Sequence, residues 1–366
     1  MIRHGRLEDI DQLVDIENSC FEQDRISRRS FRHLLTKGRS TVLVAEEAEN
    51  LTGYVLILFN RGTSLARLYS IAIAQSHRQS GIARKLVLAG ENEAVEHNCI
   101  TMRLEVRDDN LASIRLFESM DYCQFGRYLK YYEDDADAVR LEKRLIKNLP
   151  HHFTNVHYYH QTLEFTCGPA SLMMAMKTLD KRIELSRQIE LRLWRESTSI
   201  YMTSGHGGCG PYGLALAAHR RGFKVVVYVK DKDTTLFVDS VRSKDKKEVI
   251  RLVEEDFLKE MKASGVQINY QPVTTNEIIA ALDSGAVPVV LISSYRLYQE
   301  KFPHWVVMTG HDEHFIYFHD PYIDVEKGKT VTDSVNMPIA QQEFERMARY
   351  GKSGQRAALI IYPKVR

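Results

Sequence analysis

The sequence predicts a chain of two α+β domains, and three observations support this fold class. The chain has 366 residues, more than the roughly 150 that usually share one hydrophobic core. Helix and strand patterns alternate in both halves, without a fixed-period repeat. The alternation breaks near KRLIKNLPHHFTNVHYY. We therefore expect a first domain at 1–147, a linker at 148–156 and a second domain at 157–366.

In the first domain, apolar residues recur at helical spacing in three stretches. These predict helices at 7–21, 81–98 and 110–120. Runs rich in β-branched residues predict strands at 40–47, 51–59, 65–73 and 101–107, followed by a final pair of strands through 128–145.

The second domain shows a separate mixed pattern. It predicts helices at 169–179, 213–222 and 245–263, and strands at 224–229, 287–293, 304–310, 314–321 and 356–363. Helix 169–179 is apolar almost all round, which is typical of a helix buried inside its domain.

Composition excludes several classes of protein. A net charge of +2 gives no general attraction to nucleic acid. No apolar run reaches the roughly 18 residues that span a bilayer, and the N-terminal stretch lacks the apolar segment of a secretory signal. The five cysteines show no CxxC spacing, and the histidines offer no complete metal-ligand set. We expect a cytoplasmic protein with no metal and with no nucleic-acid or membrane partner.

The stretch after strand 65–73 has the pattern of a phosphate-binding turn. QSHRQSG follows the strand and leads into a helix that opens with GIARK. A strand that runs into a glycine turn at a helix N-terminus presents backbone N–H groups to an anion such as a pyrophosphate.

Arg78, Gly81 and Ala83 match the R-x-x-G-x-G/A turn of the GNAT acetyltransferase superfamily. With LEVRDDNLASIRLFESMDY farther on, residues 1–145 resemble its ribosomal-protein alanine N-acetyltransferases. The resemblance implies acetyl-CoA as cosubstrate and a peptide or protein amine as acceptor, with Glu105 as the base. It implies cofactor contacts from Ile73, Arg78, Gln79, Ser80, Gly81, Ile82, Ala83, Arg84 and Asn110.

Each of these roles has a simpler alternative. Glu105 would otherwise be a strand carboxylate paired with Arg103 or Arg107, and Asn110 would otherwise cap the helix that follows it. The resembling enzymes carry a tyrosine that protonates the leaving thiolate where this chain has Phe117. Tyr122, Tyr131 or Tyr132 could donate this proton instead. Alternatively, the thiolate of CoA could leave without a proton donor, because its thiol has a pKa of only about 8.5. Binding of acetyl-CoA or of a peptide without rapid turnover therefore stays open.

The tripeptide Cys-Gly-Pro occurs twice, at Cys167 and Cys209, each time before an apolar helical run. The positive end of a helix favours a thiolate, so both cysteines are candidate nucleophiles, although a cysteine there also simply fills space. Gln161 stands six residues before Cys167, and no glutamine stands similarly before Cys209. A glutamine amide and the cysteine N–H together make an oxyanion hole, so Cys167 is the stronger candidate.

A base and a group that orients it are expected far along the chain. His304 begins strand 304–310, and Asp320 ends the next strand. Adjacent antiparallel strands set such residues side by side, and the carboxylate then selects the imidazole tautomer. The alternative for Asp320 is a turn residue in Asp-Pro. His206 and Cys209 lie in a glycine-rich stretch that either borders the cleft or only connects to the helix after it.

The motifs Q-x5-C-G-P-A, H-W-V-V-M-T-G and D-P together resemble the cytosolic peptidases that remove double-glycine leaders from bacteriocin precursors, and related papain-like domains. The resemblance covers roughly residues 155–366. It implies a papain-like fold after the GNAT fold, and an enzyme that both acetylates and cleaves peptides. The alternatives are an acetyltransferase with a non-catalytic peptide-binding module, or amide transfer through a Cys167 thioester. The oligomeric state is not predicted.

Overall fold

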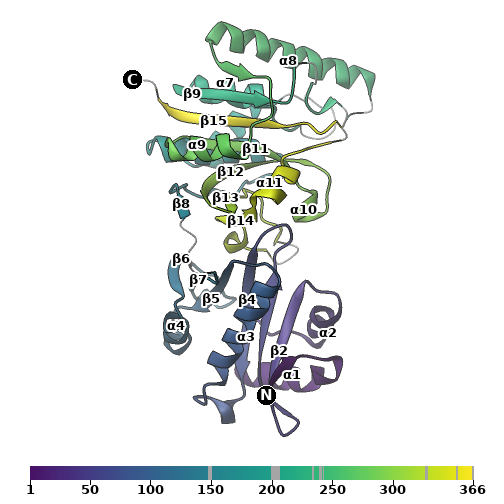
Figure 1. The fold of residues 1–366 in the computed structure, drawn as a ribbon, viewed down its shortest axis with the longest axis vertical. Helices are drawn as coiled ribbons and strands as arrows, with labels where there is room; N and C mark the ends of the chain where they lie inside the picture. The colour runs from purple at the N-terminus through teal and green to yellow at the C-terminus, as the bar shows by residue number, and fades with distance from the viewer. Residues whose placement is uncertain are drawn as a thin grey trace. The chain divides into compact units, whose positions relative to one another are not determined.

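The computed structural model describes residues 1–146, 151–198, 207–232, 235–238, 241, 243–325, 329–351 and 353–364. It divides into two compact units, Met1–Asn148 and Leu149–Arg366 (Figure 1). Each unit has its own sheet and its own hydrophobic clusters. Among the described residues, no helix combines the length and the apolar character needed to cross a membrane.

The N-terminal unit is built on a twisted sheet with the strand order β1-β2-β3-β4-β5-β7-β6. Its strands are β1 (Ile2–His4), β2 (Ser40–Glu47), β3 (Asn50–Phe59), β4 (Leu65–Ile73), β5 (Thr101–Arg107), β6 (Cys123–Tyr128) and β7 (Ala138–Arg144). Neighbours are antiparallel except β4 and β5, which run parallel. Their register covers only 65–67 on β4 and 101–103 on β5, so the remainder of both strands is left to line a cavity.

Four helices cover the two faces of this sheet. They are α1 (Ile10–Cys20), α2 (Arg28–Thr36), α3 (Ile82–Glu96) and α4 (Leu111–Glu118). Side chains of α1 and α2 pack with alternate residues of β2 and β3 in one cluster. Helices α3 and α4 pack in a second cluster against the intervening residues of the same strands, because successive side chains of a strand point to opposite faces of the sheet.

The C-terminal unit has a larger sheet with the order β10-β9-β15-β11-β12-β13-β14, which can be followed from β9 to β14 in Figure 1. Its strands are β9 (Phe223–Val229), β10 (Gln267–Asn269), β11 (Val287–Ser293), β12 (Pro303–Asp312), β13 (Phe315–His319), β14 (Met337–Ala340) and β15 (Ala357–Lys364). Strand β8 (His151–Phe153) pairs with β12, so part of the expected linker belongs to this sheet.

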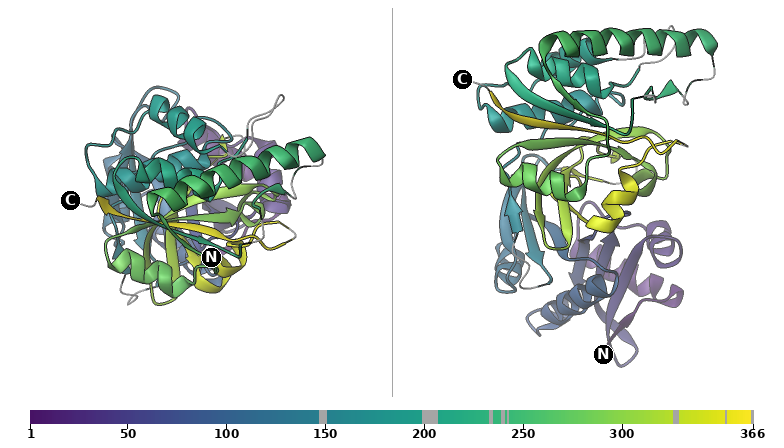
Figure 2. Two further views of the ribbon diagram at one scale, coloured as in Figure 1. Left: turned by 90° about the horizontal axis from the view of Figure 1, so that it is seen from above. Right: turned by 45° about the horizontal axis from the view of Figure 1, so that its top comes forward.

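Helices lie on both faces of this sheet too. The larger cluster packs one face against α5 (Cys167–Leu179), α6 (Arg187–Ser197), α7 (Pro211–His219) and α8 (Lys244–Ser264). The other face packs against α9 (Thr275–Asp283), α10 (Tyr295–Tyr298) and α11 (Gln341–Met347). In Figures 1 and 2, α8 is the outermost helix on its side.

Several elements differ from those expected. The first helix begins at Ile10 after a 3-10 turn at Leu7–Asp9, and the stretch 128–145 contributes one strand and the end of another. The apolar helix begins at Cys167 itself, because a proline in the first turn loses no intrahelical hydrogen bond. Helices α2 and α6 were not expected, because their apolar residues are few and interrupted by charges. Helix α9 was not expected either, although it contains the apolar run IIAAL.

Candidate active sites

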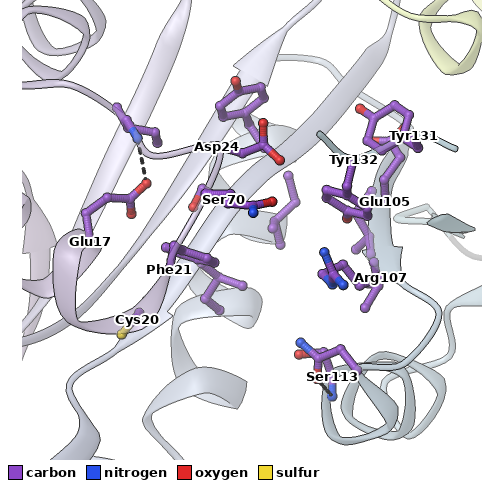
Figure 3. A pocket seen from close by; sticks show the side chains of 18 of the residues that line it. Glu17, Cys20, Phe21, Asp24, Ser70, Glu105, Arg107, Ser113, Tyr131 and Tyr132 are labelled. Carbon is purple, nitrogen blue, oxygen red and sulfur yellow. Dashed lines mark hydrogen bonds between the residues drawn. The ribbon is translucent and has the colours of Figure 1, made fainter. Parts of the chain in front are cut away.

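A cavity of about 690 Å³ opens in the N-terminal unit where β4 and β5 are no longer paired (Figure 3). Its lining comes from 67–71 on β4, 104–107 on β5, the end of α1, the loop after it, and α4. In Figure 3, Glu105, Tyr131 and Tyr132 lie across the cavity from Glu17 and Phe21.

Glu105 is 95 % buried by its side chain and lines this cavity. Its Oε2 accepts hydrogen bonds from Arg67, at 2.9 Å from Nε and 2.8 Å from a terminal nitrogen. Its buried Oε1 has no hydrogen-bond partner among the described residues. Glu105 is thus a paired carboxylate, as the alternative supposed, but its partner is Arg67 on the neighbouring strand and not Arg103 or Arg107. A buried oxygen without a donor marks a position for a ligand or a water molecule.

The tyrosines considered in place of Phe117 are not equivalent. Tyr122 packs edge-on against Phe117 and directs its hydroxyl to Met102 Sδ at 3.1 Å, so it does not line the cavity. Tyr131 and Tyr132 do line it. Burial raises the pKa of Tyr131 to about 12, although Arg67 donates to its hydroxyl at 2.9 Å. The Tyr131 phenol therefore carries its proton at neutral pH.

The turn between β4 and α3 has the conformation that an anion-binding turn needs. Gln79 and Gly81 have φ values of 62° and 81°, and Gly81 caps the start of α3. Alternation of left- and right-handed residues at a helix N-terminus aims successive N–H groups at one point. A Cβ on Gly81 would meet no atom within 4 Å, so the space before the turn is open. This conformation is compatible with a pyrophosphate bound by the backbone of residues 78–83, which stays a prediction.

The other expected cofactor residues lie at the ends of this region. Ile73 is the last residue of β4, and its carbonyl accepts from the Cys20 thiol, with 3.3 Å between Sγ and O. Asn110 both lines the cavity and caps α4, accepting from Ser113 N at 3.1 Å. Arg84 bonds the Ser119 carbonyl at 3.1 Å, which connects α3 to the end of α4.

The second candidate site lies in the C-terminal unit, where Cys167, His304 and Asp320 come together. Cys167 is the first residue of α5, and His304 and Asp320 belong to the antiparallel pair β12 and β13 and its end. His304 Nε2 lies 2.6 Å from Asp320 Oδ1, and the side chain of Cys167 is close enough to His304 to affect its charge state. With Nε2 bound to the carboxylate, Nδ1 is the ring nitrogen available to the sulfur.

The electrostatics of this group favour an imidazolium. Burial lowers the pKa of His304, but the charge and hydrogen bond of Asp320, with a smaller contribution from Cys167, outweigh burial and raise the pKa to about 10. Burial also opposes ionisation of Asp320, but His304, the Tyr298 hydroxyl at 2.6 Å and Tyr322 N at 2.8 Å hold its pKa below the ordinary value. The arrangement is a carboxylate that holds a protonated imidazole against a sulfur.

Gln161 is 4 % exposed and lies in the loop that leads to Cys167. Its backbone N–H donates to Pro321 O at 2.9 Å, beside Asp320, and its Nε2 donates to Leu163 O at 2.8 Å. An amide nitrogen carries two hydrogens, so a second one is left for a ligand. Its buried Oε1 has no partner in the described part of the chain.

The position of Cys167 relative to His304 is set by contacts between α5 and β12. Ser171 Oγ donates to Trp305 O at 3.0 Å, one helical turn beyond the cysteine and one residue beyond the histidine. Gly168 allows the close approach, because a Cβ there would lie 3.1 Å from Trp305 Cδ1. Cys167 and His304 are thus held by adjacent rigid elements.

Cys209 lies behind this group and is 3 % exposed. Its carbonyl accepts from Trp305 Nε1 at 3.0 Å, and burial raises the pKa of its thiol well above the usual value. It therefore packs in the core as a neutral thiol. Gly222 takes a positive φ of 87° after α7, as expected of a helix stop. His206 lies outside the described residues.

Comparison with known proteins assigns both units. Residues 156–362 match the Peptidase_C39 like family, more than half of the chain. The chain belongs to the Peptidase_C39 like family. This member carries an additional N-terminal unit, and residues 10–122 match the Acetyltransferase (GNAT) family. That unit is a GNAT acetyltransferase domain.

Curated relatives match the GNAT part of this Peptidase_C39 like protein. N-alpha-acetyltransferase 30 of Schizosaccharomyces pombe is 28% identical over 140 residues, which are 37% of this chain and 91% of the relative. A putative [ribosomal protein bS18]-alanine N-acetyltransferase of Bacillus subtilis is 27% identical over 136 residues, 37% of this chain and 89% of the relative. The structure of the Escherichia coli ribosomal-protein-S18-alanine N-acetyltransferase aligns at 20% identity with a TM-score of 0.37, covering 43% of this chain and 99% of that one.

Two residues of the site were not found from the sequence. Tyr298 bonds Asp320 from α10, and Glu190 bonds the Gln161 loop from α6. Neither belongs to a motif, and both reach the site only through long-range packing. A glutamate flanked by apolar residues in QIELRLW was the one available signal.

Proposed function

We propose that this protein transfers acetyl groups from acetyl-CoA to a peptide or protein amine, and that its C-terminal domain cleaves peptides with Cys167 as nucleophile. The observation that carries the peptidase half is the buried Cys167–His304–Asp320 group. A domain that only grips a peptide has no need of a charged histidine and carboxylate inside its core, because burying them costs free energy.

In the acetyl transfer, Glu105 receives the proton of the acceptor amine through its unpartnered Oε1. Arg67 holds the other oxygen and so fixes the direction of the carboxylate. The start of α3 binds the pyrophosphate of acetyl-CoA with its backbone N–H groups. Tyr131 lines the same cavity as Glu105, and its phenol, protonated at neutral pH, is the candidate proton donor to the departing thiolate.

In the cleavage, the Cys167 thiolate attacks the peptide carbonyl carbon, and the electron pair of the carbonyl bond moves to oxygen. That oxygen is bound by Gln161 Nε2 and by the Cys167 N–H, which is unused in the first turn of α5. His304 then gives its proton to the leaving amine as the C–N bond breaks. Water hydrolyses the thioester with His304 as base, whereas an amine in its place would give amide transfer.

One experiment tests both halves. The full chain is incubated with acetyl-CoA and a peptide library, and intact masses are recorded. We expect both acetylated peptides and cleaved fragments in the same reaction. A library that gains acetyl groups and is never cleaved, with no adduct at Cys167 from peptide aldehydes, would contradict the peptidase half and leave the peptide-binding alternative.

The pH dependence of cleavage should follow the raised pKa of His304. Its proton is retained until the pH approaches about 10, so the turnover rate should fall only as the pH rises through that value. In Asp320→Asn, burial still lowers the pKa of His304, and no carboxylate charge opposes it. The loss of cleavage at alkaline pH should therefore begin at a lower pH than in the wild type. Cleavage rates of both proteins from pH 6 to 11 provide the measurement. If the rate of Asp320→Asn falls at the same pH as that of the wild type, the prediction is contradicted.

Charge in the acetyl-acceptor cavity predicts a preference among peptides. Arg67 is paired with Glu105 and Arg107 with Asp134, while Glu22 and Asp24 form no ion pair with any described residue. We expect peptides with Lys or Arg beside the N-terminal residue to be acetylated about threefold to tenfold more efficiently than Asp or Glu counterparts. The difference should shrink in Glu22→Gln/Asp24→Asn and at high salt, as kcat/KM values would show.

A further inference from the structure

Glu190 is a fully buried carboxylate on α6 that the cleavage mechanism above does not use. Its two oxygens accept hydrogen bonds from one short segment, residues 159–166. The donors are Thr162 N at 2.8 Å, Thr162 Oγ1 at 2.7 Å, Tyr159 OH at 3.0 Å, and Thr166 Oγ1. A buried carboxylate is stable only when such donors compensate for its lost hydration, so the segment and Glu190 are held to each other.

That segment carries the proposed oxyanion donor and ends at the nucleophile. Gln161 lies between Tyr159 and Thr162, and Thr166 directly precedes Cys167. The segment is also joined to the turn of Asp320, because Gln161 N donates to Pro321 O at 2.9 Å. Tyr158, the residue just before the segment, donates from its hydroxyl to Asp320 O at 3.0 Å. The loop is therefore held by Glu190 of α6 and is also hydrogen-bonded to the turn of Asp320.

We propose that Glu190 is the positioning residue of the oxyanion hole, acting through Gln161, in the peptidase reaction proposed above, on which this inference rests. The amide of Gln161 has one partner within its own loop, Leu163 O, and its Oε1 has none in the described residues. Contacts of Gln161 itself are therefore too few to fix the amide. The four hydrogen bonds to Glu190 hold the backbone on both sides of it.

If Glu190 positions the oxyanion hole, its loss should affect two reactions of the Cys167 sulfur differently. Acylation by an activated peptide ester forms a C–S bond, places the carbonyl electron pair on oxygen and expels the alcohol, so it needs the oxyanion hole. Alkylation by iodoacetamide forms a C–S bond and expels iodide, and no oxyanion arises. A misplaced Gln161 should slow the first reaction and leave the second unchanged.

The test compares both rate constants at Cys167 in the full chain, followed by mass spectrometry of the peptide that contains it. Glu190→Gln removes the charge and keeps the shape. We expect the ratio of acylation to alkylation to fall about tenfold to a hundredfold. Thr162→Val, at an exposed position, removes one donor and should lower the ratio less, which decides the matter if Glu190→Gln does not fold.

Asp312→Asn is the matched control. Asp312 is also buried in this unit and accepts from His314 N, Phe315 N and Tyr317 OH, and it lies at the other end of β12 from His304. Its ratio should equal that of the wild type. The inference about Glu190 would be overturned if the Glu190 and Thr162 variants fold and keep the wild-type ratio of acylation to alkylation. It would also be overturned if Asp312→Asn lowers this ratio as much as Glu190→Gln does. Neither outcome would contradict the peptidase proposal. A wild type that iodoacetamide alkylates and no ester acylates would overturn the peptidase proposal with it.

Discussion

Replacing Cys167 with alanine is expected to reduce peptide cleavage by at least about 10³-fold, because no other described residue places a nucleophile against His304. Acetyl transfer should continue at the wild-type rate, since the cavity that contains Glu105 belongs to the other unit. Fragment release and acetyl incorporation, measured in one reaction by mass spectrometry, check both expectations.

Cys209→Ala is the matched control, because it is the same exchange in the same tripeptide. Cys209 is buried and neutral, so its loss should lower the free energy of unfolding by about 1 kcal/mol and leave cleavage within a few-fold of the wild type. Equal loss of cleavage in both variants would show that Cys167 matters for packing. Cleavage that survives Cys167→Ala would remove this residue from the mechanism.

Glu105→Gln is expected to lower the rate of acetyl transfer by about 10²-fold to 10⁴-fold, the usual contribution of a general base. The amide keeps the shape of the side chain and cannot take a proton from the acceptor amine. Cleavage by the C-terminal unit should not change. Initial rates with acetyl-CoA and an accepted peptide, at several pH values, provide the measurement.

Glu142→Gln serves as the control for this exchange. Glu142 lies on β7, in register with Arg103 of β5, and forms an ion pair with it at 3.0 Å without lining the cavity. Its loss removes an ion pair from the same sheet, and acetyl transfer should stay near the wild-type rate. If both variants lose activity alike, the arginine pairing of the sheet, and not proton transfer, explains the effect of Glu105.

The local part of both sites could be predicted from the sequence. Cys167 was expected near the start of a buried helix, and His304 and Asp320 at the ends of adjacent strands, and the structure brings the three together. Such predictions succeed because a helix start or a strand end depends on a few neighbouring residues. The partner of Glu105 was not predictable, because it depends on the parallel register of β4 and β5.

The residues that support the site, Glu190 and Tyr298, could not be predicted from the spacing of apolar residues in the sequence. Glu190 reaches the loop at 159–166 from α6, a helix that is polar enough to be taken for a connection. Tyr298 reaches Asp320 from a helix of only four residues. Packing of the sheet decides which of many buried polar side chains meet, so these roles appear only in three dimensions.

The two Cys-Gly-Pro tripeptides lie next to each other in the fold. A Cβ at Gly168, in the first, would lie 3.4 Å from Cys209 Cβ in the second and 3.1 Å from Leu214 Cδ1. The side chains of Leu214 and Trp305 therefore leave no room for a side chain at position 168. Among homologous chains, a larger residue at 168 should accordingly be accompanied by a smaller residue at 214 or 305.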